Sequence, residues 1–119
     1  MESPFYGRIT VTEKTLERIG LKPGQRVLEI GPGPGRLLIP AAKKVLPDGE
    51  VVGVDIQPGM VELLKERAAN ITNLMAILGD ATQSVVSAAS FDVAFLVTTL
   101  GEIPDCAAAL TQCFRALKS

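Results

Sequence analysis

Apolar residues along this chain fall into two patterns, short continuous runs and longer stretches in which they recur every three or four positions. The runs are typical of buried parallel strands and cover residues 26–30, 51–56, 74–80 and 91–97. The helical pattern covers residues 10–20, 35–46, 58–70 and 104–118, while 82–90 is a short helix or a loop. Strands that alternate with helices indicate right-handed crossovers. The predicted fold class is therefore α/β, a Rossmann-like doubly wound parallel sheet.

Two local features refine the helical pattern. Pro40 lies early in the second helical stretch and is expected to kink or delay its first turn. In the last stretch an apolar face is expected from spacings of four, three, four and three residues, formed by Ile103, Ala107, Leu110, Phe114 and Leu117. Cys106 and Cys113 would lie about 10 Å apart on that helix, too far for a disulfide, and we expect both in the core.

Length, charge and composition limit the function. With 119 residues the chain is expected to form one domain over 1–119, with an N-terminal helical segment (1–20) and an α/β core (21–119). A net charge of −1 argues against general nucleic-acid binding. The absence of histidine excludes a histidine-based triad and disfavours zinc, and no metal site is expected. No signal-peptide pattern or membrane-length apolar run is present, so we expect a cytoplasmic protein without a membrane span.

The most informative stretch is "GPGPG", residues 31–35, directly after the first predicted strand. Asp55 ends the second strand and Asp80 follows the third, so all three features lie where parallel α/β sheets bind ligands. An acid at the position of Asp55 suits a ribose diol. The pattern lacks the lysine of a phosphate-binding loop and the third glycine of a dinucleotide fingerprint, and Pro32 and Pro34 remove amide donors. A nucleoside ligand without phosphate is favoured over NAD.

Four segments in order resemble the motifs of class I S-adenosylmethionine-dependent methyltransferases, in particular the ubiquinone and menaquinone biosynthesis group. They are "VLEIGPGPG", "VVGVDIQPGMVELLKERA", "LMAILGDAT" and "FDVAFLVTTLGEIPD". The resemblance implies S-adenosylmethionine as cofactor and assigns roles residue by residue. It implies that Asp55 binds the ribose hydroxyls, that Ile56 packs on the adenine, and that Asp80, with Ala81 beside it, binds the adenine amino group. Thr98 and Thr99 would border the transferred methyl group. The residues that would surround the methionine part are Glu29, Gly31, Gly33 and Gly35.

Several alternatives stay open. The glycines can form only a tight strand-to-helix turn, Asp55 can cap the following helix, and Asp80 can be a turn or cap residue. The resemblance implies methyl transfer to a small-molecule acceptor, with the catalytic residues unassigned. A non-catalytic cofactor-binding interaction module and a different nucleotide-binding α/β domain are the alternatives.

The last expectation concerns the C-terminal side. In the family a fifth strand follows the segment that "FRALKS" matches, whereas this sequence ends at Ser119. The fourth strand would then be flanked by the first on one side only, with unpaired edge groups that the last helix cannot satisfy. Such an edge pairs readily with another chain, and we expect a homodimer through the fourth strand or the last helix.

Overall fold

The computed structural model describes residues 20–32, 35–80, 86, 89–96 and 106–118. They form seven elements, which follow one another in the order β1 (Arg26–Ile30), α2 (Leu38–Lys44), β2 (Glu50–Asp55), α3 (Pro58–Arg67), β3 (Leu74–Leu78), β4 (Val93–Leu96) and α4 (Cys106–Ala116). None of the helices in this part of the chain has the length and apolar character that crossing a membrane requires. The predicted helix over 10–20 lies outside the described residues, apart from Gly20.

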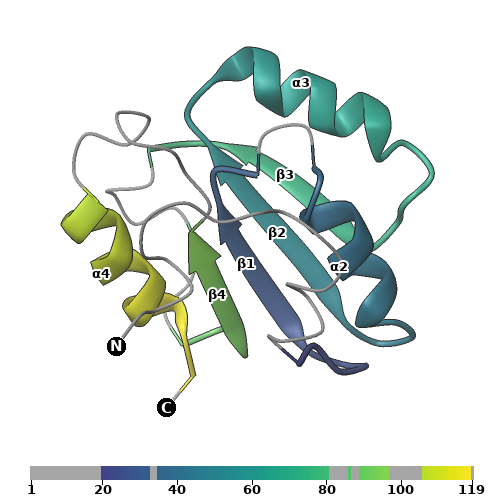
Figure 1. The fold of residues 1–119 in the computed structure, drawn as a ribbon, viewed down its shortest axis with the longest axis horizontal. Coiled ribbons are helices and arrows are strands. Elements are labelled where there is room, and N and C mark those ends of the chain that lie inside the picture. Colours follow the sequence, from purple (N-terminus) through teal and green to yellow (C-terminus); the bar gives the residue numbers. More distant parts are fainter. Residues whose placement is uncertain (1–19, 33–34, 81–85, 87–88, 97–105, 119) are drawn as a thin grey trace.

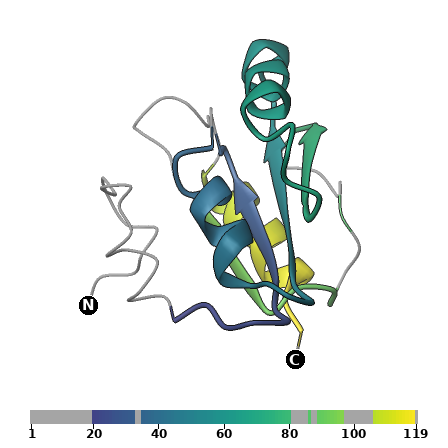
Figure 2. The same ribbon diagram turned by 90° about the vertical axis from the view of Figure 1, so that its right-hand side faces the viewer.

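The four strands form one parallel sheet in the order β3-β2-β1-β4 (Figure 1). The order reverses at β1, because the chain first adds β2 and β3 on one side and then places β4 on the other. This is the doubly wound arrangement predicted from the alternation of strands and helices. Figure 2 shows that the strands point toward the end of the sheet at which α3 begins.

Each face of the sheet has its own apolar core. Because side chains alternate along a strand, Val27 and Val51 point to one face, and Leu28 and Val52 point to the other. The first face packs against α2 and α3, in a cluster with Leu37, Leu38, Ala41, Ala42, Val45, Leu64 and Ala68. The second packs against α4, in a cluster with Ile30, Val54, Phe91, Ala94, Cys113 and Ala116. Helices on both faces confirm the predicted fold class.

Strand β1 has the predicted bounds and β2 is shifted by one residue, whereas α2, α3 and β3 are shorter than the sequence patterns predicted. Helix α2 begins at Leu38 rather than at Gly35, so Pro40 lies in its first turn, where the missing amide costs no helical hydrogen bond. The expected delay of this turn is confirmed. Strand β3 ends at Leu78, and β4 (Val93–Leu96) begins two residues later than predicted, while Val97 lies outside the described residues. The residues cut from β3, Gly79 and Asp80, are turn residues, and Asp92 interrupts the apolar run before β4.

The predicted apolar face of α4 is partly wrong. Phe114 is 71% exposed, whereas Cys113 and Ala116 are buried against the sheet. The physical reason is the space beneath the helix, which the buried ring of Phe91 already occupies, so that α4 presents small side chains there. The expectation that Cys113 is a core thiol is confirmed, and burial raises its pKa to about 11. The side chain of Cys106 lies outside the described set.

The outer edge of β4 is partly paired. Phe91, just before β4, forms a parallel bridge with Leu117. Its amide donates to the carbonyl of Ala116 at 2.9 Å, and its carbonyl accepts from the amide of Lys118 at 2.9 Å. The expectation that the end of the chain leaves this edge wholly unsatisfied is therefore wrong at Phe91, because the residues after α4 turn back alongside the start of the strand.

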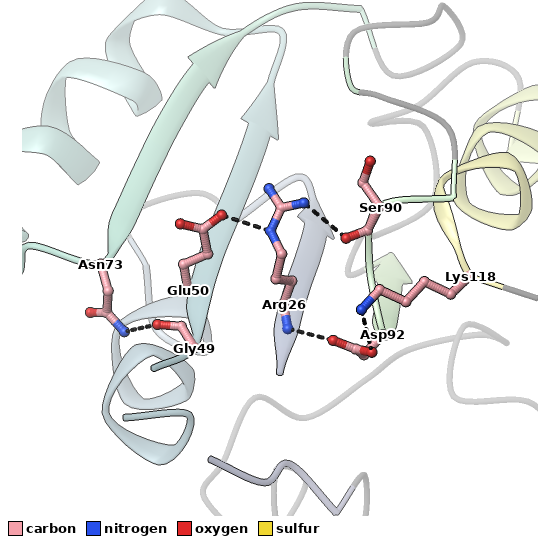
Figure 3. A network of polar contacts seen from close by, with 7 residues as sticks. All are labelled: Arg26, Gly49, Glu50, Asn73, Ser90, Asp92 and Lys118. Carbon is pink, nitrogen blue, oxygen red and sulfur yellow. Dashed lines mark hydrogen bonds and ion pairs between the residues drawn. The ribbon is translucent and has the colours of Figure 1, made fainter. Parts of the chain in front are cut away.

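A polar network joins the strands at the amino-terminal end of the sheet, where β1, β2 and β4 begin (Figure 3). The Arg26 guanidinium donates to Glu50 Oε1 at 2.7 Å and to the carbonyl of Ser90 at 2.9 Å. The Arg26 amide donates to Asp92 Oδ2 at 2.8 Å, and Lys118 Nζ lies 3.1 Å from Asp92 Oδ1. The Arg26 amide and then the Lys118 side chain lower the pKa of Asp92. These contacts join the starts of β1, β2 and β4 to the segment after α4.

The amide of Asn73 extends this anchoring to β3. Its Nδ2 donates to the carbonyl of Ala42 at 2.8 Å and to that of Gly49 at 3.0 Å (Figure 3 shows the second contact). The start of β3 is thus held to α2 and to the residue before β2. With the amino-terminal ends held in this way, the carboxyl ends of the strands carry the loops that the sequence analysis singled out.

Candidate cofactor site

The carboxyl ends of β1, β2 and β3 meet at one edge of the sheet. The amide of Gly31 donates to the carbonyl of Val54 at 2.8 Å, which extends the β1–β2 pairing by one residue. The amide of Gly79 donates to the carbonyl of Asp55 at 2.9 Å and does the same for β2 and β3. The predicted neighbours Gly31, Asp55 and Asp80 are thus carried on adjacent strand ends, as the parallel sheet requires.

The loop after β1 turns through residues with left-handed backbone. Gly31 has φ 76° and Gly35 has φ 96°, and the Gly35 amide closes the turn onto the carbonyl of Pro32 at 3.0 Å. A Cβ on Gly35 would lie 2.6 Å from Leu64 Cδ1 and 2.9 Å from Ile39 Cδ1. Gly35 therefore has local reasons to be glycine, which supports the tight-turn interpretation for this position whatever the ligand.

Glu29 is a buried acid in the middle of the site. Its side chain is 1% exposed, and Oε1 has no hydrogen-bond partner among the described residues. In the register of the sheet Glu29 lies opposite Gly53, which offers no side chain, and the ring of Pro32 packs over that glycine. Burial first, and the charge of Asp55 second, raise the pKa of Glu29 to about 8. A buried carboxyl group with an oxygen that lacks a described partner favours its neutral form unless a positive group binds beside it.

Asp55 shapes the loop that leads into α3. Its Oδ1 accepts a hydrogen bond at 3.0 Å from the amide of Gln57. Gln57 is the N-cap residue of α3, and no side chain caps this helix. The interpretation of Asp55 as the helix cap is therefore wrong: its carboxylate holds the turn before the helix. Asp55 also acts electrostatically on Glu29, so the two acids of neighbouring strands belong to one site.

Apolar side chains lie beside this acidic pair. Ile56, predicted to contact an adenine, is 56% exposed directly after β2. Leu78 is 54% exposed and lies opposite Asp55 in the register of β2 and β3. The sequence analysis did not single out Leu78, although its position directly before Gly79 and Asp80 was a signal. Exposed apolar residues next to a carboxylate suit a ligand that carries both a flat ring and hydroxyl groups.

The remaining predicted site residues divide into two groups. Asp80 follows β3 and is half-buried. The other four lie outside the described residues, and their predicted roles stay predictions: Gly33, Ala81, Thr98 and Thr99. Among the predicted site residues that the structure describes, it places the acids Glu29, Asp55 and Asp80 and the glycines Gly31 and Gly35 at the carboxyl ends of neighbouring strands.

A doubly wound sheet with a glycine turn after β1 and an acid at the end of β2 defines a nucleoside-binding α/β domain. The methyltransferase domain family matches residues 27–119, and the chain belongs to this family. Over 106 residues it is 32% identical to a demethylmenaquinone methyltransferase of Staphylococcus aureus. That match covers 89% of this chain and 44% of the relative, so the chain spans less than half the length of this curated relative.

Solved structures show the same fold. A SAM-dependent methyltransferase from Aquifex aeolicus superimposes with a TM-score of 0.81 at 28% identity, over 89% of this chain and 57% of the other. The YcgJ protein from Bacillus subtilis gives a TM-score of 0.75 at 25% identity, over 90% and 45% of the two chains. These findings confirm a class I S-adenosylmethionine-dependent methyltransferase fold, with S-adenosylmethionine as the cofactor predicted from the sequence.

The described residues fit this cofactor. S-adenosylmethionine carries a sulfonium and an ammonium group together with a ribose and an adenine. The site offers two acids, Glu29 and Asp55, of which Glu29 has a buried oxygen without a partner among the described residues. Next to them lie the exposed apolar side chains of Ile56 and Leu78. Both the charge and the apolar character of the site match the ligand.

Proposed function

We propose that this chain is the cofactor-binding domain of a methyltransferase that uses S-adenosylmethionine to methylate a small-molecule acceptor. The observation that carries the proposal is the acidic pair Glu29 and Asp55 on neighbouring strand ends beside a glycine turn. Membership of the methyltransferase domain family supports the same conclusion.

Each residue of the proposed site contacts one part of the cofactor. Glu29 faces the methionine part, with Gly31, Gly33 and Gly35 shaping the loop around it, and Asp55 accepts hydrogen bonds from the ribose hydroxyls. The adenine is held by Ile56, Asp80 and Ala81, and Thr98 borders the reacting methyl group. The bound cofactor supplies an electrophilic methyl group on a sulfonium. The chain itself binds, orients and excludes water.

The acceptor is proposed as a small molecule, with reduced quinones as the first class to test. The support is the name of the Staphylococcus aureus relative, a demethylmenaquinone methyltransferase. The net charge of −1 offers little attraction for nucleic-acid phosphates. Incubation with radiolabelled cofactor and a panel of short-chain quinols, catechols and amines tests this. Label transferred to an RNA substrate and to none of these acceptors would refute a small-molecule acceptor.

Calorimetric titration with S-adenosylhomocysteine tests the cofactor site directly, with NAD as the comparison ligand. We expect saturable binding of the first and none of the second. Asp55→Ala should weaken binding by about 1.5–3 kcal/mol, the usual contribution of hydrogen bonds to a charged group. Asp48→Ala removes an equally charged, exposed side chain before β2, at the far end of the sheet, and should leave binding unchanged. Saturable NAD binding without a response to S-adenosylhomocysteine would overturn the assignment.

We also propose a homodimer that forms through the outer edge of β4 or through α4. The support is the exposed side chain of Phe114 on α4 and the edge of β4 beyond the bridge at Phe91. A two-fold contact of this kind closes on itself. Light scattering after size-exclusion chromatography should give twice the chain mass, and Phe114→Ser should lower it. A monomer at high micromolar concentration would refute the dimer.

A cytoplasmic location is the last part of the proposal. Cys113 is a free, buried thiol, and free thiols are usual for proteins of reducing compartments. Fractionation of cells that express the tagged protein should recover it with cytoplasmic markers, and recovery with periplasmic or secreted markers would contradict the proposal.

A further inference from the structure

The carboxyl group of Glu29 lies where an ionised acid is poorly stabilised. Its side chain is 1% exposed, and Oε1 accepts no hydrogen bond from the described residues. In the register of the sheet its neighbour on β2 is Gly53, which has no side chain and therefore brings no polar partner. The charged group that acts on it is Asp55, which has the same sign. A carboxyl group in these surroundings favours its neutral, protonated form.

The charged groups on the elements packed around β1 do not offset this. The basic residues of α2, Lys43 and Lys44, lie in its last turn. This turn lies near the start of β1, because the carbonyl of the next residue, Val45, accepts a hydrogen bond from the amide of Gly24, which precedes β1. Arg36, before α2, is exposed. The charged residues of α3 are all exposed: Glu62, Lys65, Glu66 and Arg67. Strand β4 contributes no charged residue between Val93 and Leu96.

We propose that Glu29 holds a proton in the ligand-free protein and releases it to solvent when the ammonium group of the cofactor's methionine part binds beside it. This inference rests on the proposed function, which places that part of the cofactor next to Glu29. The step is a single deprotonation: the O–H bond of the carboxyl group breaks, the electron pair stays on the oxygen, and the buffer takes the proton. The carboxylate then pairs with the incoming cation.

The size of the effect follows from the pKa of Glu29, about 8 in the ligand-free protein. An adjacent cation lowers the pKa of a carboxyl group by roughly one to three units. With a shift of about two units, binding at pH 7 releases about 0.8 protons per ligand. The same shift makes binding about eightfold tighter at pH 8.5 than at pH 7.

Isothermal titration of the whole chain with S-adenosylhomocysteine, in buffers of different ionisation enthalpy, counts these protons without measuring catalysis. The comparison ligand is 5′-methylthioadenosine, which keeps the adenine, ribose and sulfur but lacks the ammonium and carboxylate. We expect about 0.8 protons released at pH 7 for the first ligand and fewer than about 0.2 for the second.

Two variants test whether the released proton comes from Glu29. Glu29→Gln should abolish the release and flatten the pH dependence, apart from the titration of the ligand's own ammonium group, which the wild type shares. Glu62→Gln makes the same chemical change on the exposed surface of α3 and should release as many protons as the wild type. If Glu29→Gln does not fold, the difference in proton release between the two ligands on the wild type still shows whether the ammonium-bearing part of the ligand causes the release.

The possible failures are distinct. Binding of S-adenosylhomocysteine with equal heats in all buffers at pH 7, or equal proton release by both ligands, would overturn the inference and leave the proposed function intact. Absence of binding by both ligands would overturn the proposed function and this inference with it. Proton release that persists in Glu29→Gln would assign the proton to another group and refute the role of Glu29.

Discussion

Replacing Glu29 by glutamine should change how the stability of the ligand-free protein depends on pH. The native pKa of Glu29 is raised to about 8, from an ordinary value of 4.5, chiefly because the side chain is buried. In the unfolded chain the carboxyl group is solvated and ionises near its ordinary value. Glutamine has nearly the same shape and stays neutral at every pH, so it removes this difference between the two states.

The sign and magnitude follow from proton linkage. Below pH 4.5 both states hold the proton, and the carboxyl group makes its full contribution to stability. Between pH 4.5 and 8 the unfolded chain has lost the proton that native Glu29 keeps. The free energy of unfolding therefore falls by about 1.4 kcal/mol per pH unit and levels off above pH 8. Accumulated to pH 8, the loss is on the order of 4 kcal/mol, a large part of the stability of a small domain.

Urea denaturation of the wild type and Glu29→Gln at pH 5, 6, 7 and 8 measures this loss. The two proteins should be close in stability at pH 5, and the variant should be more stable by several kcal/mol at pH 8. Glu62→Gln, an exposed neutralisation on α3, should follow the wild type. The lowered pKa of Asp92 does not interfere, because its contribution is present above its ordinary pKa of 3.8 and is lost only in more acidic solution.

Parallel stability profiles for the wild type and Glu29→Gln between pH 5 and 8 would refute this reasoning. They would mean that the native protein holds Glu29 in the same ionisation state as the unfolded chain. A variant that is less stable at every pH would mean that the carboxylate makes contacts which glutamine cannot replace.

Three further outcomes follow from other parts of the fold. Arg26→Ala removes the hydrogen bonds to Glu50 and to the Ser90 carbonyl, and should lower the free energy of unfolding in urea by about 1–2 kcal/mol, since these groups are partly exposed. Gly35→Ala should lower the free energy of unfolding by about 2–4 kcal/mol in the same assay. The reason is that Gly35 has a φ of 96° and that a Cβ there would lie 2.6 Å from Leu64 Cδ1. In a Cys106→Ala background, Cys113 should resist iodoacetamide at pH 8 until urea unfolds the protein, because burial raises its pKa to about 11.

The sequence predicted the succession of strands and helices and the doubly wound sheet, because these depend on local signals and on the handedness of the crossovers. The place of the fourth strand beside the first was implied by the family resemblance. Apolar runs, turn residues and right-handed crossovers fix β1, β2 and β3 along the chain, and Asp55 and Asp80 follow from the strand ends. The isolation of Glu29 could not be predicted in this way. It depends on the residue opposite it on β2, Gly53, and the register that places this glycine there is a property of the folded sheet.

The orientation of α4 shows the same limit. Helical spacing correctly predicted an amphipathic helix, but two residues one position apart, Cys113 and Phe114, are buried and 71% exposed respectively. A rotation of about 100° about the helix axis separates the two side chains, so the direction in which the helix faces the sheet determines which of them is buried. In the folded protein Cys113 and Ala116 share a core cluster with Phe91, which comes from a distant segment, and helical spacing alone does not contain this tertiary contact.

Among the described residues, the two ends of the sheet differ in how well their polar groups are satisfied, and this difference supports the proposed cofactor site. At the amino-terminal end the charged side chain of Arg26 has two described partners, and both oxygens of Asp92 are used. At the carboxyl-terminal end Glu29 is buried, its Oε1 has no hydrogen-bond partner among the described residues, and the like charge of Asp55 acts on it. A requirement of folding does not account for it, because a neutral side chain of the same shape would stabilise the native state above pH 5. We therefore propose that a positively charged ligand supplies the partner that Glu29 Oε1 lacks among the described residues.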